Sequence, residues 1–215
     1  MTYLEAVNNV LIRLREDEVE SVSDNSYSKL IGLFINDALV EVESAWDWSA
    51  LRNTLTVTTT PNIFNYSLVG TNNNAKVLDV INDTSNFFMH YKEQHWFNNR
   101  FLNINPIAGN PSYYTFNGVN NNGDTQIDLY PIPDTVYTLR FNMILRSPKL
   151  ANNTDKIQVP YLPIILLATA LASRERGETG GSLTPELMVN AKQALSDAIA
   201  LDAGKHPEET VFYTV

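Results

Sequence analysis

Cysteine is absent from this sequence of 215 residues, and histidine occurs only three times. Without cysteine the chain can form no disulfide, no thiolate metal site and no cysteine nucleophile, which fits a protein made in a reducing cytoplasm. Long hydrophobic runs are also missing, because the longest, around residues 164–172, is too short to span a bilayer. The first residues lack the basic and apolar regions of a secretory signal. We therefore expect neither a membrane partner nor secretion.

Positive charge is scarce as well: 15 Lys and Arg stand against 24 Asp and Glu, for a net charge of −9. A protein that binds DNA through its phosphates needs a basic surface, so tight nucleic-acid binding is not predicted. An acidic surface along which DNA slides without binding is compatible with this composition. For the carboxylates near the N-terminus we expect a solvated or partner-facing helix surface. They are Glu5, Glu16, Asp17, Glu18, Glu20, Asp37, Glu41 and Glu43.

Residues 1–50 predict two amphipathic helices joined by a short loop, which should pack as an antiparallel hairpin. Apolar residues recur three to four positions apart in each helix and therefore share one face. The cap of the second helix is expected at Ser21, Ser23 or Asp24. The first stripe is Leu4, Val7, Leu11 and Leu14, and the second is Tyr27, Ile31, Phe34, Ala38, Val42 and Ala45, closed by Trp46 and Trp48.

Residues 51–150 predict an inserted β-module. Apolar and polar residues alternate between positions 137 and 146, which indicates a half-buried strand. Asn122-Gly123 lies between two further strand-like runs, 113–117 and 126–130, and is typical of a hairpin tip. A short helix is expected around residues 92–98.

Residues 151–204 predict a second helical hairpin. Residues 161–173 are apolar nearly all round, so this helix should be the central and most buried one. Thr184-Pro185-Glu186 predicts the start of the next helix, with Thr184 as the N-cap. Its expected stripe is Leu187, Ala191, Leu195, Ala198 and Leu201. The length suits one domain with an inserted module. The predicted fold is therefore α+β: a four-helix bundle from the two hairpins, an inserted antiparallel β-module and a C-terminal arm over residues 205–215.

The end of the arm is strand-prone and has no hairpin partner nearby. It consists of Thr210, Val211, Phe212, Tyr213, Thr214 and Val215. One interpretation is a frayed tail, or a strand that pairs with the chain's own β-module. The other is an arm that adds a strand to another subunit or partner. An exposed apolar terminus is otherwise an aggregation hazard, which favours a partner.

Residues that could support catalysis are few. His90 and His95 lie five positions apart with Glu93 between them, which matches no zincin motif and points the rings apart on a helix. Asp37 and Glu41 could form a carboxylate pair, but no other residue supports it. No serine elbow or phosphate loop occurs, and residues 120–124 fit a turn better than a calcium loop. We predict no catalytic residue, metal site or cofactor.

Several segments resemble phage adaptor proteins. Residues 3–11, YLEAVNNVL, and residues 41–48, EVESAWDW, resemble tail tubular protein A of short-tailed bacteriophages, with Ala45 where that family usually has glycine. The loop over residues 14–19, LREDEV, departs from the family's usual L-G-E-x-P-V. Residues 109–115, 127–134 and 137–141 are similar to a "P-x-Y-Y … L-Y-P-x-P-D … Y-x-L-R" pattern in a wider set of adaptors. The resemblance covers most of the chain in a shared order.

The resemblance implies a structural virion protein without catalytic residues. Such adaptors are made in the host cytoplasm and form a ring of about twelve copies between portal and tail, with DNA passing through the centre unbound. The implied partners are the portal protein, a tail tube or nozzle protein and, as a further candidate, tail fibres. The acidic loop, Glu16, Asp17, Glu18 and Glu20, is a candidate to face the lumen or a partner. The alternatives are a stopper or tail-completion protein and a small carboxylate-dependent hydrolase.

Overall fold

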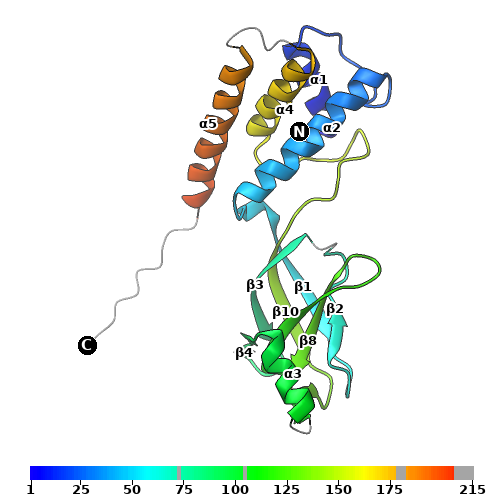
Figure 1. The fold of residues 1–215 in the computed structure, drawn as a ribbon, viewed down its shortest axis with the longest axis vertical. Coiled ribbons are helices and arrows are strands. Elements are labelled where there is room, and N and C mark those ends of the chain that lie inside the picture. Colours follow the sequence, from blue (N-terminus) through cyan, green and yellow to red (C-terminus); the bar gives the residue numbers. More distant parts are fainter. Residues whose placement is uncertain (72–73, 104–105, 178–182, 206–215) are drawn as a thin grey trace, which may run out of the picture. The chain divides into compact units, whose positions relative to one another are not determined.

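A computed structural model describes residues 1–71, 74–103, 106–177 and 183–205 of the chain (Figure 1). The chain divides into two compact units. Residues 1–51 and 147–215 form one, called here the helical unit, and Arg52–Arg146 form the other, the β-module. The described residues contain five α-helices together with mostly antiparallel strands. The α+β class predicted from the sequence is therefore confirmed.

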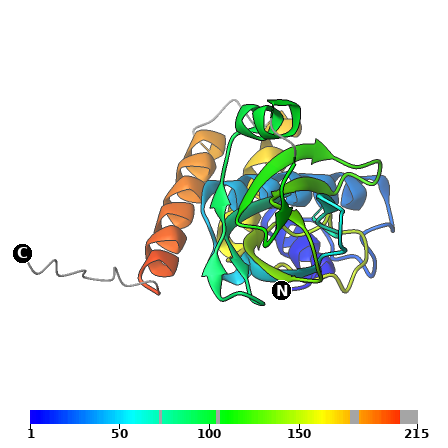
Figure 2. The same cartoon turned by 90° about the horizontal axis from the view of Figure 1, so that it is seen from below.

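The helical unit contains α1 (Tyr3–Arg13), α2 (Ser26–Ala45), α4 (Tyr161–Glu175) and α5 (Leu183–Ala203), with the short 3-10 helix η1 (Ser49–Leu51) after α2. Helix α4 packs against α1, α2 and α5, as its apolar circumference predicted. Helix α5 packs chiefly against α4 and lies at one flank of the unit (Figure 2). It begins at Leu183, so Thr184 lies inside the helix and is not the predicted N-cap.

The two N-terminal helices begin at polar caps. Thr2 caps α1 and forms a capping box with Glu5. Asn25 caps α2 and forms the corresponding box with Ser28, so the cap predicted at Ser21, Ser23 or Asp24 was placed too early. A side-chain oxygen that accepts from the N3 amide satisfies one of the unpaired amides at a helix start.

Most predicted apolar stripes are buried. Val7, Leu11 and Ile31 are at most 2% exposed, and Trp48 is buried with its indole N–H donated to a main-chain oxygen in α2. Three assignments were wrong. Ala45 and Trp46, at the end of α2, are exposed, the latter by 37%, and Leu201 is 74% exposed although the spacing in α5 predicted burial. Leu201 is exposed because α5 packs chiefly against one helix, α4. That single contact covers only part of the apolar face of α5.

The β-module is built from two four-stranded sheets, in the orders β1-β10-β3-β4 and β2-β8-β7-β5. The longer strands are β1 (Arg52–Thr58), β3 (Ala75–Asn82), β7 (Tyr113–Val119), β8 (Thr125–Tyr130) and β10 (Thr138–Leu145). The shorter ones are β2 (Asn65–Ser67), β4 (Phe87–Phe88), β5 (His90–Tyr91), β6 (Ala108–Gly109) and β9 (Ile132–Pro133), with β6 and β9 paired separately. Helix α3 (Gln94–Asn103) is the short helix expected within this block.

The core of the β-module lies between its sheets. The predicted strand at 137–146 is β10, which pairs with β1 on one side and β3 on the other. Its residues Leu139 and Phe141 are fully buried, as are Ile127 and Leu129 of β8. The predicted hairpin joins β7 to β8, and Gly123 at its tip has φ +87°, a conformation that favours glycine.

Candidate assembly surfaces

The acidic loop between α1 and α2 is exposed but firmly held. Both amide atoms of the Asn8 side chain bind the main chain of Val19, each at 3.0 Å. The Asp24 carboxylate accepts the main-chain N–H groups of Glu20 and Ser21 at 2.8 and 2.9 Å. These contacts fix the backbone, so the side chains of the loop extend from a defined position. The exposed carboxylates are Glu16, Asp17, Glu18 and Glu20.

Arg176, at the end of α4, ties the loop to the helices. Its guanidinium donates to Glu16 Oε1 at 2.6 Å, to the Tyr27 hydroxyl at 2.6 Å and to the main-chain oxygen of Leu14 at 3.3 Å. The guanidinium also lies 4.7 Å from the centroid of the Tyr27 ring. Within the described part of the chain, the side chains of Asp17, Glu18 and Glu20 form no hydrogen bond or ion pair. Three of the four carboxylates therefore face solvent with their charge uncompensated.

Two buried carboxylates hold the chain where it leaves and re-enters the helical unit. Asp202, in the last turn of α5, accepts the Ser49 main-chain N–H at 2.9 Å, the Ser49 hydroxyl at 2.5 Å and Lys205 Nζ at 3.0 Å. Glu43, on α2, is 3% exposed and accepts the main-chain N–H of Ser147 at 3.1 Å. The sequence predicted a solvated Glu43 and gave Asp202 no role, because both partners are more than one hundred positions away.

The pKa of Asp202 reflects these contacts. Burial alone would raise this pKa, because a low dielectric disfavours the charged form. The hydrogen bonds from Ser49 and the ammonium of Lys205 outweigh burial and lower the pKa to about 2. Asp202 is therefore ionised at neutral pH, where it accepts all three of these hydrogen bonds.

The buried amide of Asn36 organises the segment that follows the β-module. Its Nδ2 donates to the Tyr3 hydroxyl at 3.1 Å and to the Leu150 oxygen at 3.2 Å, and its Oδ1 accepts the Leu150 N–H at 2.8 Å. Both main-chain groups of Leu150 are thus satisfied by one side chain. A segment without secondary structure can be buried only when its main-chain polar groups find such partners.

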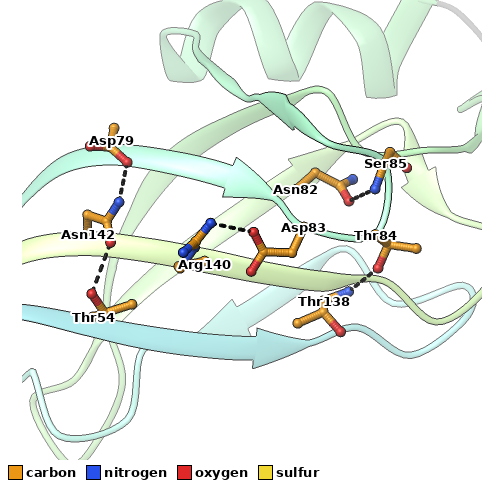
Figure 3. A network of polar contacts seen from close by, with 9 residues as sticks. All are labelled: Thr54, Asp79, Asn82, Asp83, Thr84, Ser85, Thr138, Arg140 and Asn142. Atoms are coloured by element: carbon orange, nitrogen blue, oxygen red, sulfur yellow. Dashed lines mark hydrogen bonds and ion pairs between the residues drawn. The ribbon is translucent and has the colours of Figure 1, made fainter.

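A row of polar contacts crosses the sheet β1-β10-β3 (Figure 3). Asn142 on β10 accepts from the Thr54 hydroxyl at 3.0 Å and donates to Asp79 at 2.6 Å, so it links both neighbouring strands. Further along, Arg140 donates to Asp83 at 2.8 Å. Asn142 and the Arg140–Asp83 pair are engaged in these contacts, and the buried Arg140 Nε has no hydrogen-bond partner among the described residues.

A second cluster combines aromatic rings with positive charge and is called here the Trp96 patch. Arg100 lies 5.0 Å from the Trp96 ring centroid, and Lys92 Nζ lies 5.9 Å from Trp96 and 5.6 Å from the Tyr113 ring. The patch comprises His90, Lys92, His95, Trp96, Arg100 and Tyr113. His90 and His95 are exposed, whereas the other four residues are half-buried.

The Trp96 patch rests on a packed aromatic base. Phe97, the next residue of α3, is fully buried; its ring lies 5.4 Å from the Trp96 ring and 6.4 Å from the Tyr130 ring. Trp96 itself makes an edge contact with Tyr130 at 5.6 Å. Such contacts between rings fix the helix against β7 and β8, so the cationic groups extend from a rigid support.

The residues considered for catalysis do not converge. Asp37 and Glu41 are both exposed on α2, and Glu41 borders a shallow cleft beside Lys192 of α5. His90 lies on β5, whereas His95 lies on α3 and bonds the Asn99 amide at 3.1 Å. Among the described residues no three acidic or histidine side chains gather in a metal-binding arrangement. An enzyme needs converging polar groups in a pocket, and these residues do not provide them.

Residues 120–124 form the predicted turn. The Asn120 carboxamide oxygen accepts the N–H groups of Asn122 and Asp124 at 2.8 and 2.9 Å, and Asp124 in turn accepts the N–H of Gly70 at 2.8 Å. The side-chain oxygens of Asn120 and Asp124 thus bind main-chain N–H groups of this turn and of Gly70. The predicted arm, Thr210 to Val215, lies outside the described residues.

Comparison with known protein families gives a match over nearly the whole chain. The family model described as SU10 adaptor protein matches residues 1–209, and therefore covers both units. A search of curated proteins found no match. In the part of the chain that the structure describes, no helix has the length and hydropathy needed to cross a membrane.

Proposed function

Because the chain belongs to the SU10 adaptor protein family, a family of phage head-to-tail adaptors, we propose that it is a structural subunit of the virion neck that joins the portal to the tail. The observation that carries the proposal is the family match over residues 1–209. The match spans the helical unit and the β-module in one continuous stretch. The arrangement of the surfaces supports it, since they offer rigid, charged and aromatic patches in place of a converging polar pocket.

The adaptor would act as a closed ring of about twelve copies, in which each copy contacts two neighbours through different surfaces. The helical unit would supply the lateral contacts, with α1, α2, α4 and α5 packed as a four-helix bundle. It carries exposed apolar side chains suited to such contacts, including Leu33 and Val40 one above the other on α2, which are 48% and 62% exposed. The β-module would contact the tail tube, nozzle or fibres.

Charge supports passage of DNA through such a ring. Twelve copies at −9 each would carry roughly 100 negative charges. A lumen of that sign would deny DNA the phosphate contacts that cause it to bind. The acidic loop is exposed and its charges are largely uncompensated, so it suits either the lumen or a partner.

The C-terminal arm would be the contact that locks the ring in place. Thr210 to Val215 would add a strand to a neighbouring copy, to the portal or to the next tail component, because unpaired strand edges bind extended segments through main-chain hydrogen bonds.

The proposal is tested by mixing the purified chain with portal rings and examining the mixture by electron microscopy and sedimentation. We expect the chain alone to be monomeric and to form a ring stacked on the portal. A chain that binds only to portals already carrying another ring would be a stopper or tail-completion protein instead. A chain that never joins a portal-containing assembly would contradict the neck function itself.

The arm is tested by deleting residues 206–215. We expect the deletion to abolish stacking on the portal while circular dichroism and the unfolding midpoint stay unchanged, because the shortened chain keeps every described helix and strand. Normal stacking by the shortened chain would show that the arm is dispensable.

A further inference from the structure

The charge of the chain is divided unequally between its two units. The β-module contains six Lys or Arg and six Asp or Glu, whereas the remainder contains nine and eighteen. The difference of nine equals the net charge of −9 of the whole chain, so all of that charge belongs to the helical unit. The β-module is neutral overall, and the Trp96 patch concentrates positive charge within it.

The side chains of Lys92 and Arg100 in the Trp96 patch are positioned to bind an acidic partner. Within the described residues, neither Lys92 nor Arg100 forms an ion pair. Both are instead held over aromatic rings, which reduces the conformational freedom that a flexible side chain loses when it binds. Their N–H groups remain free to donate, and two exposed histidines extend the same surface.

Carboxylates fit this patch better than nucleic acid does. Single-stranded nucleic acid is bound largely by stacking of bases on open aromatic faces. The Trp96 face is already covered by Arg100 at 5.0 Å, so the patch offers N–H donors in place of an open ring. Arginine and lysine donors paired with carboxylates form strong charge-assisted hydrogen bonds.

The acidic loop has the complementary properties. Four carboxylates occur within the five residues 16–20, and those of Asp17, Glu18 and Glu20 are exposed and uncompensated. The backbone of the loop is fixed by Asn8, Asp24 and Arg176, so little ordering is required on binding. Two rigid surfaces of opposite charge bind with a smaller entropy loss than flexible ones.

We propose that the acidic loop of one copy binds the Trp96 patch of a neighbouring copy. The inference rests on the proposed ring, in which each copy presents different surfaces to its two neighbours. Because the acidic loop and the Trp96 patch are different surfaces of the chain, a contact between them has a direction. Because both surfaces are near solvent, salt weakens the contact.

Zero-length carbodiimide cross-linking tests the contact directly, since it joins a lysine amine only to a carboxylate that touches it. Chains labelled with ¹⁴N and with ¹⁵N are mixed, and the reagent is applied both to rings assembled on the portal and to concentrated free chain. We expect peptides that join Lys92 of one label to Asp17, Glu18 or Glu20 of the other. Same-label links alone would place the contact within one chain and overturn the proposal.

Charge reversal gives an independent test. Lys92→Glu/Arg100→Glu and Asp17→Lys/Glu18→Lys should each reduce the formation of rings on the portal at least tenfold, and mixing the two variants should restore it. Arg52→Glu and Asp37→Lys reverse exposed charges elsewhere in the same two units and should have little effect. Failure of the mixed variants to associate, or equal effects of the controls, would count against the contact.

The outcomes separate this inference from the proposed function. Rings without a mixed-label link to Lys92 would leave the adaptor function standing and remove the loop-to-patch contact. A mixed-label link in the free chain without rings on the portal would keep the contact and contradict the ring. Absence of both would remove both proposals.

Discussion

Asp202 is a buried carboxylate whose three hydrogen bonds stabilise the end of α5 against the chain that leaves α2. Its pKa is about 2 in the folded protein, below the ordinary value of 3.8. A carboxyl whose pKa is lowered by folding stabilises the protein above its unfolded pKa, and this stabilisation is lost as the pH falls through the folded pKa. The contribution is therefore complete at neutral pH and declines between about pH 4 and pH 2.

We predict that Asp202→Asn lowers the free energy of unfolding at pH 7 by about 2 kcal/mol. At pH 3 the difference from the wild type should fall to about half, because the wild-type carboxyl is then losing its advantage. Urea unfolding at the two pH values measures both quantities. Asp197→Asn, on an exposed position of the same helix, should change stability by less than about 0.5 kcal/mol. Equal losses for the two variants would contradict the role of Asp202.

At the scale of the helices, the crossing of α1 and α2 depends on the missing side chain of Gly32. A Cβ at this position would lie 2.4 Å from the Tyr3 hydroxyl and 2.9 Å from Val22 Cγ1. The Tyr3 hydroxyl cannot move away freely, because it accepts a hydrogen bond from Asn36. Glycine inside a helix is ordinarily a disadvantage, and here it is required by the close approach of a neighbouring side chain.

We predict that Gly32→Ala destabilises the protein by about 2 kcal/mol, since overpacking outweighs the gain in helix propensity of about 1 kcal/mol. Adding Tyr3→Phe to Gly32→Ala should recover part of the loss, whereas Tyr3→Phe alone should be destabilising because Asn36 loses a partner. Thermal unfolding of the three variants tests the coupling. A stabilising Gly32→Ala would show that α1 shifts without cost.

The elements that the sequence predicted are those with a local signal. The periodic stripes of α1, α2 and α4, the alternation in β10 and the Asn122-Gly123 turn each depend on neighbouring residues. The contacts of Glu43 with Ser147 and of Asp202 with Ser49 join positions far apart in the chain, and the periodicity of the sequence does not predict them. The exposure of Leu201 was missed for the same reason, since the spacing marks a face but not how much of it another helix covers. The Trp96 patch could have been suspected from its interleaved aromatic and basic residues.

At the scale of the whole molecule, the two units have separate cores. Ile127 and Phe141 are fully buried in the core of the β-module, and the helical unit buries its own set, including Ile31 and Ile164. Units with separate cores and short connections open independently when one of them is weakened.

We predict that Ile127→Ala, which removes buried methyl groups at a cost of about 2–5 kcal/mol, speeds amide hydrogen exchange in β7, β8 and β10. Exchange in α1, α2 and α4 should remain slow, because their core is untouched. Mass spectrometry of exchange in the full chain measures both sets of peptides. Phe116→Ala, at a 39% exposed position on β7, is the control and should change neither set strongly. Equal loss of protection in the helices would show that the chain unfolds as one unit.

The hydrogen bonds from Ser49 to Asp202 and from Ser147 to Glu43 have a consequence for how the sequence of such a protein can diversify. Glu43 and Asp202 each bind a main-chain N–H, a group that every residue except proline provides. The helical unit therefore binds the chain just before and just after the β-module through main-chain groups, and these contacts do not depend on the sequence of the module. Residues 52–146 therefore occupy a position at which one inserted module could be exchanged for another by recombination, while the helical unit and its contacts at Ser49 and Ser147 stay the same.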